Sequence, residues 1–210
     1  MAAQWRWLPP RPRSRADQRK SAQGSVVVPR YVAFLRAINV GGRFVKMAEL
    51  AKHFGTLGHS DVETFIASGN VIFWSRSRSA TALARSIEDG LEPLLGYRSQ
   101  AFIRTDLELQ ALARRASSQQ AAYRASVAPQ GEVNVALMTL PLSPAQAVAL
   151  AALRSELDDF SHSGTEVYWM CKSKQSDSKF SNAVFERKLA TKATFRRTSM
   201  LERLAGHLRE

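Results

Sequence analysis

The sequence has a single cysteine, Cys171, among 210 residues, and it has no long hydrophobic run. One cysteine excludes an intramolecular disulfide framework and is typical of a protein from a reducing compartment. The apolar stretch AQAVALAAL (145–153) has about half the roughly 18 residues that a membrane-spanning helix needs. We therefore expect a soluble, cytoplasmic protein that has no membrane partner.

Acidic residues are also scarce, with 18 Asp and Glu against 30 Lys and Arg, so the formal net charge is +12. The excess lies at the two ends of the chain. Residues 1–30 hold seven basic residues and one acid, and residues 171–210 hold ten basic residues and four acids. The central segment, 31–170, is neutral. Basic ends are compatible with nucleic-acid binding whose affinity falls steeply as salt rises.

Residues 1–30 mix Arg, Pro, Ser and Gln and lack the apolar core of a secretory signal peptide. We interpret them as a disordered basic arm. Valine codons of the GTG type can serve as bacterial starts, so the three valines Val26–Val28 suggest that translation begins there and that the arm is a miscalled extension. An organelle transit peptide or a nucleic-acid-binding tail is the alternative.

Residues 31–105 alternate between strand-like and helix-like apolar spacing in the order β-α-β-β-α-β. This order predicts a first α/β plait of the ferredoxin-like type. A hairpin is predicted where Ser68 and Gly69 join two strand patterns. The predicted strands are 31–38, 62–67, 70–74 and 98–104, and the predicted helices are 47–57 and 83–95.

A connector helix and loop are predicted over residues 106–132. Thr105 and Glu108 stand at capping-box positions, and residues 117–131 lack an apolar period, which predicts a loop between domains. Residues 133–210 nearly repeat the first element order and predict a second plait with a C-terminal helix. The predicted elements are a strand over 133–140, a helix over 143–157, a hairpin turning at Ser163-Gly164, a helix from Ser178 to Leu189, a short edge strand over 193–197 and a helix over 200–208. The predicted fold class is α+β, with two tandem ferredoxin-like α/β plaits.

The segment LRAINVGGRFVK (35–46) is the first candidate for chemistry. Arg36 ends a strand, Asn39 and Gly41-Gly42 permit unusual backbone angles, and free amides in such a turn can cradle an anion. The segment is neither a Walker A loop nor a GxGxxG dinucleotide motif. A glycine-permitted strand–helix crossover with a solvated arginine is the alternative interpretation.

Two further segments carry candidate residues. Ser68, Gly69 and Asn70 form the hairpin turn, and turn chemistry alone explains them as well as a ligand role does. The block 176–197 places side chains at a predicted helix start, where anions are favoured, and the alternative is a capped basic surface helix. Its candidate residues are Ser178, Lys179, Asn182, Thr194 and Arg196.

The sequence predicts neither a metal site nor a catalytic triad. The four histidines are scattered, without an HxxxH motif, and there is only one cysteine, so the sequence does not indicate a zinc site. His59, Ser60 and Asp61 are contiguous, whereas a triad is built by spatial geometry. The strand 70–74 also lacks the stacking aromatic pattern of an RNA-recognition plait. No metal, cofactor or catalytic residue is predicted.

The motifs LRAINVGG, MAEL, TFIASGNVIF, SKFSNAVFERKL and TFR, between Tyr31 and Leu204, resemble the bacterial family called domain of unknown function 1697. The resemblance implies tandem α/β plaits, adds Arg104 to the family-like positions, and supplies no catalytic residues. The family pattern tends towards N-W-N-T after its T-x-R triplet, whereas this chain continues with residues 197–200, Arg-Thr-Ser-Met. If that stretch helps build a ligand site, the site is altered here.

The leading hypothesis is a domain that binds a small anionic ligand, such as a phosphate compound, in a cleft between the plaits. An enzyme of unknown reaction in the same cleft and nucleic-acid binding through the basic ends are the alternatives. The sequence does not indicate an oligomeric state. The candidate ligand residues are Arg36, Asn39, Gly41, Gly42, Ser68, Gly69, Asn70, Arg104, Ser178, Lys179, Asn182, Thr194 and Arg196.

Overall fold

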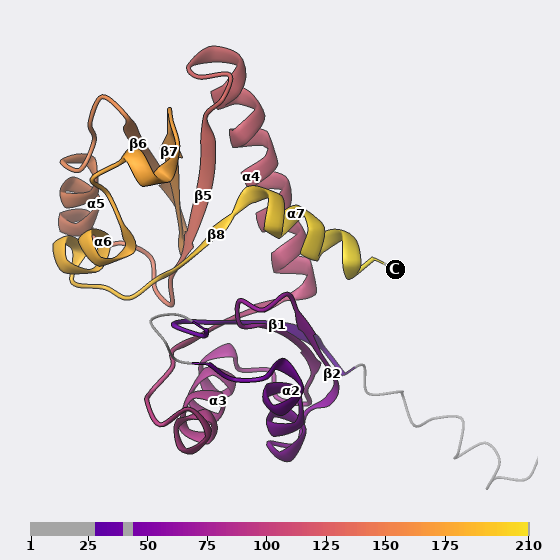
Figure 1. Cartoon of the computed structure of the whole chain (residues 1–210). Coiled ribbons are helices and arrows are strands. Elements are labelled where there is room, and N and C mark those ends of the chain that lie inside the picture. The colour runs from indigo at the N-terminus through magenta and orange to yellow at the C-terminus, as the bar shows by residue number, and fades with distance from the viewer. Residues whose placement is uncertain (1–27, 40–43, 210) are drawn as a thin grey trace, which may run out of the picture.

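The computed structural model describes residues 28–39 and 44–209 of the chain. It has two plaits with the same element order, as the sequence predicts (Figure 1). The first plait comprises β1 (Arg30–Leu35), α2 (Met47–Thr56), β2 (Ser60–Phe65), β3 (Asn70–Trp74), α3 (Ala80–Leu95) and β4 (Ala101–Thr105). The second comprises β5 (Glu132–Leu137), α5 (Pro144–Ala151), β6 (Asp158–Ser163), β7 (Glu166–Cys171), α6 (Asn182–Leu189) and β8 (Thr194–Arg197). One further helix follows each plait: α4 (Asp106–Ser126) and α7 (Thr198–His207).

Each plait contains one antiparallel four-stranded sheet. The strand order is β2-β3-β1-β4 in the first sheet and β6-β7-β5-β8 in the second, so the first strand of each plait lies inside its sheet. The last strand pairs with the first at an equivalent place in both sheets. Arg104 of β4 lies opposite Val32, and Arg196 of β8 lies opposite Val135.

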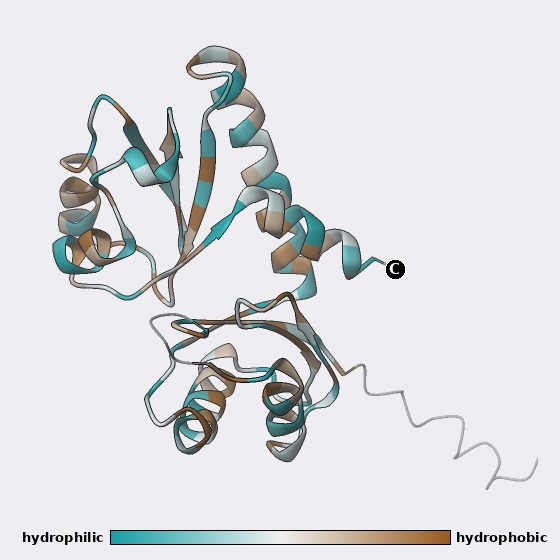
Figure 2. Cartoon of the chain, in the orientation of Figure 1, coloured by the Kyte–Doolittle hydropathy of each residue, from teal (hydrophilic) through white to brown (hydrophobic). Residues whose placement is uncertain are grey.

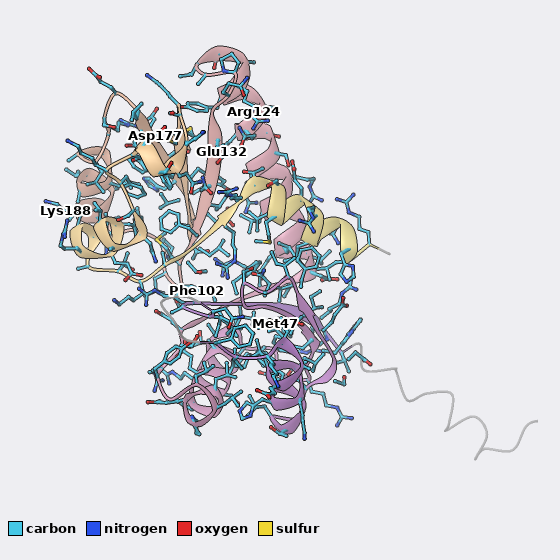
Figure 3. All side chains as sticks on the ribbon, viewed as in Figure 1. Met47, Phe102, Arg124, Glu132, Asp177 and Lys188 are labelled. Carbon is cyan, nitrogen blue, oxygen red and sulfur yellow. The ribbon has the colours of Figure 1, made fainter. Side chains whose placement is uncertain are left out.

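Three hydrophobic clusters hold the layers together. Helices α2 and α3 cover the outer face of the first sheet, and α5 and α6 cover the outer face of the second. The third cluster joins the inner faces of both sheets to α4 and α7, which pack against one another (Figure 1). Phe102 of β4 belongs to this cluster and lies at the boundary between the plaits (Figure 3). The two sheets therefore share one central core.

Capping boxes and amphipathic spacing explain why these segments form helices. Thr105 and Glu108 form the predicted capping box at the start of α4, and Ser143 and Gln146 form another at the start of α5. Helices α2 and α3 alternate hydrophobic and hydrophilic residues, as expected for helices that cover one face of a sheet (Figure 2). Within the described ranges, none of the helices combines the length and apolarity that a membrane crossing requires.

Three local predictions are wrong. Residues 117–126 continue α4 instead of starting a loop, because Tyr123 of the last turns is buried in the shared core. Helix α5 ends at Ala151, earlier than the predicted residue 157. The helix predicted from Ser178 begins only at Asn182, as α6, because the Ser181 side chain caps it by accepting the Val184 N–H; a short 3₁₀ turn at Gln175–Asp177 precedes it.

Candidate functional site

Arg196 of β8 crosses from the second plait to the first and uses all five of its N–H donors. Its Nε donates to Asn70 Oδ1 at 2.8 Å, and its Nη2 donates to the carbonyls of Leu35 and Ser68 at 3.0 and 3.1 Å. Its Nη1 donates to Thr194 Oγ1 at 2.7 Å and to the Phe195 carbonyl at 2.9 Å. Every acceptor is neutral, so burial lowers the pKa of Arg196 to about 10.

The hairpin turn of the first plait is shaped to accept this guanidinium. Asn70 is fully buried, and its amide donates to the Phe65 carbonyl and to Ser68 Oγ at 3.1 and 2.8 Å. Gly69 has a φ of +71°, and a Cβ there would come within 2.8 Å of Ile38 Cγ1. The turn therefore requires glycine, since an L side chain would meet both strain and a clash.

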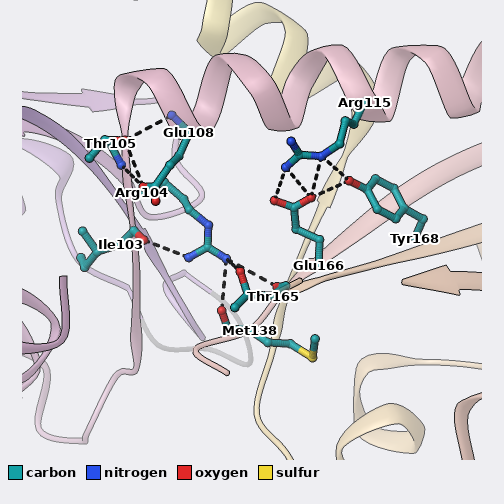
Figure 4. Close-up of polar contacts among 9 residues, drawn as sticks. All are labelled: Ile103, Arg104, Thr105, Glu108, Arg115, Met138, Thr165, Glu166 and Tyr168. Carbon is teal, nitrogen blue, oxygen red and sulfur yellow. Dashed lines mark hydrogen bonds and ion pairs between the residues drawn. The ribbon is translucent and has the colours of Figure 1, made fainter. Parts of the chain in front are cut away.

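Arg104 of β4 crosses in the opposite direction (Figure 4). Its Nη2 donates to the Met138 carbonyl at 3.1 Å and to Thr165 Oγ1 at 2.9 Å, and its Nη1 donates to the Ile103 carbonyl at 2.9 Å. Only 9% of Arg104 is exposed. Burial lowers the pKa of Arg104, and the nearby Glu166 carboxylate partly offsets this effect.

A second polar cluster lies beside Arg104 and joins α4 to the second sheet (Figure 4). Arg115 of α4 binds both carboxylate oxygens of Glu166, with Nη2 at 2.6 Å from Oε1 and at 2.8 Å from Oε2. The Tyr168 hydroxyl donates to Glu166 Oε2 at 2.5 Å. Burial, together with this bond to the carboxylate, raises the pKa of Tyr168 to about 12. Tyr168 therefore stays a protonated donor near neutral pH.

Arg36, at the end of β1, is the third arginine that bridges the plaits. Its Nη2 lies 2.7 Å from Oε2 of Glu186 on α6. Lys192 Nζ lies 3.0 Å from the same oxygen, and its side chain is 60% exposed. Arg36 Nε is buried and has no hydrogen-bond partner among the described residues. Two cations thus share one carboxylate, which leaves a net charge of about +1 at this place.

The loop after Arg36 has an unusual backbone. Ala37 and Asn39 have φ values of 58° and 54°, in the left-handed region that most side chains avoid. Asn39 Oδ1 accepts the Val45 N–H at 2.8 Å, so the asparagine joins the two sides of the loop. Gly41 and Gly42 lie outside the described residues.

The structure places Ser178 and Lys179 away from the arginine bridges. Ser178 Oγ donates to Asp158 Oδ2 at 2.7 Å, at the start of β6. Lys179 lines a cavity of about 380 Å³ whose charged lining also includes Glu156, Asp158 and Asp177. Its lining therefore has more negative than positive charge, which does not favour an anion. The Oδ1 atom of Asn182 is buried and has no hydrogen-bond partner among the described residues.

The segment that departs from the family pattern begins α7. Thr198 is buried and donates its hydroxyl proton to the Val133 carbonyl at 2.8 Å. Met200 is buried in the shared core, with its sulfur 3.8 Å from the Asn70 amide nitrogen. Arg197 and Ser199 are exposed. The two buried side chains of this segment contact the core and the hairpin turn.

The predicted site residues therefore divide into groups. Ser68, Gly69, Asn70, Thr194 and Arg196 come together where the plaits meet, whereas the side chain of Arg36 pairs with Glu186. Arg104 bridges the plaits elsewhere, and Ser178 and Lys179 line or flank a separate cavity. Glu186 lies in the family-like motif SKFSNAVFERKL but is not among the candidate ligand residues, although it pairs with Arg36. Lys192, which pairs with Glu186, is missing from both sets. No group of three or more His, Cys, Asp or Glu side chains that could hold a metal ion occurs within the described ranges.

A family model described as a protein of unknown function, DUF1697, matches residues 28–168 of the chain. A solved structure with a similar fold is a conserved bacterial protein from Streptococcus pneumoniae, with a TM-score of 0.67 and 22% sequence identity. That likeness covers 87% of this chain and 99% of the other. No curated protein matches the chain. At this level of identity, the structural likeness shows the fold alone.

Proposed function

The chain belongs to the DUF1697 family of proteins of unknown function, and we propose that it binds a small anionic ligand where its two plaits meet. The contacting group in this proposal is Arg36. Its neighbours Glu186 and Lys192 belong to the second plait, so the ligand would bind between residues of both plaits.

The proposal is carried by the difference between Arg36 and the other two bridging arginines. Arg196 uses all five donors within the protein, and Arg104 is 9% exposed with both terminal nitrogens hydrogen-bonded. The Arg36 side chain is 32% exposed, and among the described residues its guanidinium bonds to Glu186 alone. An arginine fork with unused donors is suited to carboxylate or phosphate oxygens.

The local charge supports an anion in preference to a cation. Glu186 is the only carboxylate within salt-bridge distance of Arg36 or Lys192 among the described residues. A small oxyanion that contacts both cations would compete with this carboxylate for them. The backbone strain at Ala37 and Asn39 adds support, because such strain clusters at ligand sites. Amides of Gly41 and Gly42 as further donors remain a prediction.

Calorimetric titration with pyrophosphate at low salt tests the proposal. Arg36→Gln should weaken binding by about ten- to a hundredfold, because a charge-assisted hydrogen bond contributes about 1.5–3 kcal/mol. Arg98→Gln is the matched control, since Arg98 is also an ion-paired arginine but contacts Glu88, Asp89 and Glu92 elsewhere. Equal affinities of wild type and Arg36→Gln would refute the proposal.

Because Arg36→Gln also removes the bond to Glu186, a second variant separates binding from packing. Lys192→Gln removes the other cation, whose side chain is mostly exposed and on the surface. It should leave the free energy of unfolding nearly unchanged and still weaken pyrophosphate binding. Unchanged binding in Lys192→Gln would restrict the ligand to Arg36 and remove the two-cation site from the proposal.

A further inference from the structure

A large cavity lies at the other end of the first sheet, where β1 begins and β3 ends. Its volume is about 590 Å³, which lies within the 300–1,000 Å³ typical of small-molecule sites. Arg36 follows the end of β1, so this cavity is separate from the anion site proposed above. The lining residues come from the end of α2, the starts of β2 and α3, and the loop Ser75-Arg76-Ser77.

The polar part of the lining carries positive charge and free hydroxyl groups. Arg76 is exposed and has no ion-pair partner in the part of the chain that the structure describes. Ser60 and Ser86 make no side-chain hydrogen bond to other described residues. Ser75 is 7% exposed, and its Oγ accepts the Ser77 N–H at 3.3 Å, which leaves its own proton free to donate. The lining contains no carboxylate from the described residues.

The remaining lining is apolar or aromatic. Trp74, Leu57 and Leu83 supply a surface for a hydrocarbon or aromatic body. The Arg30 guanidinium lies 5.6 Å from the centre of the Trp74 ring, but it pairs with Asp106 at 3.4 Å and so adds no net charge near the cavity. His59 also lines the cavity, with its ring packed 4.6 Å from that of Phe73. Burial lowers the pKa of His59, so the imidazole is neutral and adds no negative charge.

We propose that this cavity binds an organic anion, in which an oxyanion group contacts Arg76 and the serine hydroxyls and a hydrophobic body lies against Trp74 and Leu57. The combination of one unpaired guanidinium, free hydroxyls and no carboxylate among the described lining residues selects against cations and against neutral apolar molecules. Carboxylates and phosphate monoesters share this chemistry, and the competition experiment below separates them.

Two fluorescent dyes with nearly the same hydrophobic body test the proposal on the full chain. Anilinonaphthalene sulfonate carries an anionic group, and N-phenylnaphthylamine does not. The sulfonate dye should bind wild type at least about tenfold more tightly than the neutral dye, because only the former can pair with Arg76. Equal affinities for the two dyes would overturn the proposal, since the polar lining would then contribute nothing.

Two matched variants test whether the dye binds in the cavity. Arg76→Gln should weaken the sulfonate dye by about tenfold or more and leave the neutral dye unchanged. Arg78→Gln, in the same loop but outside the lining, should change the affinity less than twofold. An equal effect of both variants would show a general charge effect and overturn the proposal. All these side chains are exposed, so the variants should fold.

A further variant tests the location by filling the cavity. Ser86→Phe places a large ring on an exposed helix position that lines the cavity and should abolish binding of the sulfonate dye. Retained binding would overturn the proposal.

Phenyl phosphate and phenylacetate, added as competitors of the sulfonate dye, show which oxyanion the site prefers. Failure of both compounds to displace the dye would also overturn the proposal. Arg36→Gln should leave dye binding unchanged, which makes this test independent of the first proposal.

Discussion

Arg104 and Arg196 occupy equivalent positions in the two plaits, and each donates hydrogen bonds to the other plait. Arg104 contacts the end of β5 and the β6–β7 turn, through Met138 and Thr165. Arg196 contacts the end of β1 and the β2–β3 turn, through Leu35 and Ser68. Each arginine stands two residues before the helix that follows its plait. The two plaits are therefore joined by a reciprocal pair of buried guanidinium groups.

This reciprocity gives a physical reason for several of the sequence motifs. The Ser-Gly-Asn turn supplies a carbonyl and an amide oxygen to Arg196, and Gly69 allows the turn to approach β1 closely. A buried arginine without a carboxylate is stable only if neutral acceptors satisfy its donors. The burial of Arg196 therefore depends on the Ser68–Asn70 turn, although the two are far apart in the chain.

The first prediction concerns Arg196→Lys. Lysine keeps the charge but has three donors in place of five, so at least two neutral acceptors in the buried contact lose their partner. We expect the free energy of unfolding, measured in urea, to fall by about 2–4 kcal/mol. Arg98→Lys, at an exposed ion-paired position, should leave it unchanged within error. Similar small effects of both variants would contradict the structural role of Arg196.

The second prediction is a coupling between Asn70 and Arg196. In a double-mutant cycle with Asn70→Ala and Arg196→Lys, the two changes should be non-additive by about 1–3 kcal/mol, because the side chains share a hydrogen bond. The same cycle with Arg104→Lys should be additive within about 0.5 kcal/mol, since Arg104 bonds to the opposite plait. Additivity in the first cycle would count against the contact.

The third prediction compares glycines in the two equivalent hairpin turns. Gly69 and Gly164 both have positive φ, +71° and +54°, but of these two only Gly69 is so closely surrounded that an added Cβ would lie within 4 Å of other side chains. Gly69→Ala should therefore destabilise the protein by about 1–3 kcal/mol more than Gly164→Ala. Thermal unfolding of the two variants measures this difference. Equal melting temperatures would show that Ile38 moves aside without cost.

The fourth prediction is a pH dependence from His59. Because burial lowers the pKa of His59 below 6.5, the unfolded chain binds this proton at a higher pH than the folded chain does. The stability that the neutral imidazole contributes is present above pH 6.5 and is lost as the pH falls below that value. His59→Phe should therefore lose less stability than wild type between pH 7 and pH 5, in urea unfolding at each pH. Parallel curves would contradict this account.

The fold was largely predictable because its signals are local. Strand and helix periods, together with the Thr105 and Ser143 capping boxes, place the elements of both plaits in the correct order. The end of α4 was not predictable, because its last turns owe their stability to Tyr123 in the shared core. Burial of this kind depends on tertiary packing that a polar-looking segment does not reveal.

The candidate site was predictable in part. The motifs placed Arg36, Asn70 and Arg196 among the candidate ligand residues, but sequence alone did not show that Arg196 has all its donors occupied within the protein. Lys192 was missed because no motif marks an exposed lysine whose importance comes from its partner Glu186. Which cation remains available to a ligand depends on hydrogen-bond partners from distant segments.

Anion binding at Arg36 is tested most directly by Glu186→Gln, which keeps the size of the side chain and removes the competing carboxylate. Two unit charges about 5 Å apart interact by about 0.8 kcal/mol even in water, so pyrophosphate should bind the variant about fourfold more tightly or better. Calorimetric titration of wild type and variant at the same low salt concentration measures this change. Unchanged or weaker binding in Glu186→Gln would contradict the proposal that an anion competes with Glu186 for Arg36.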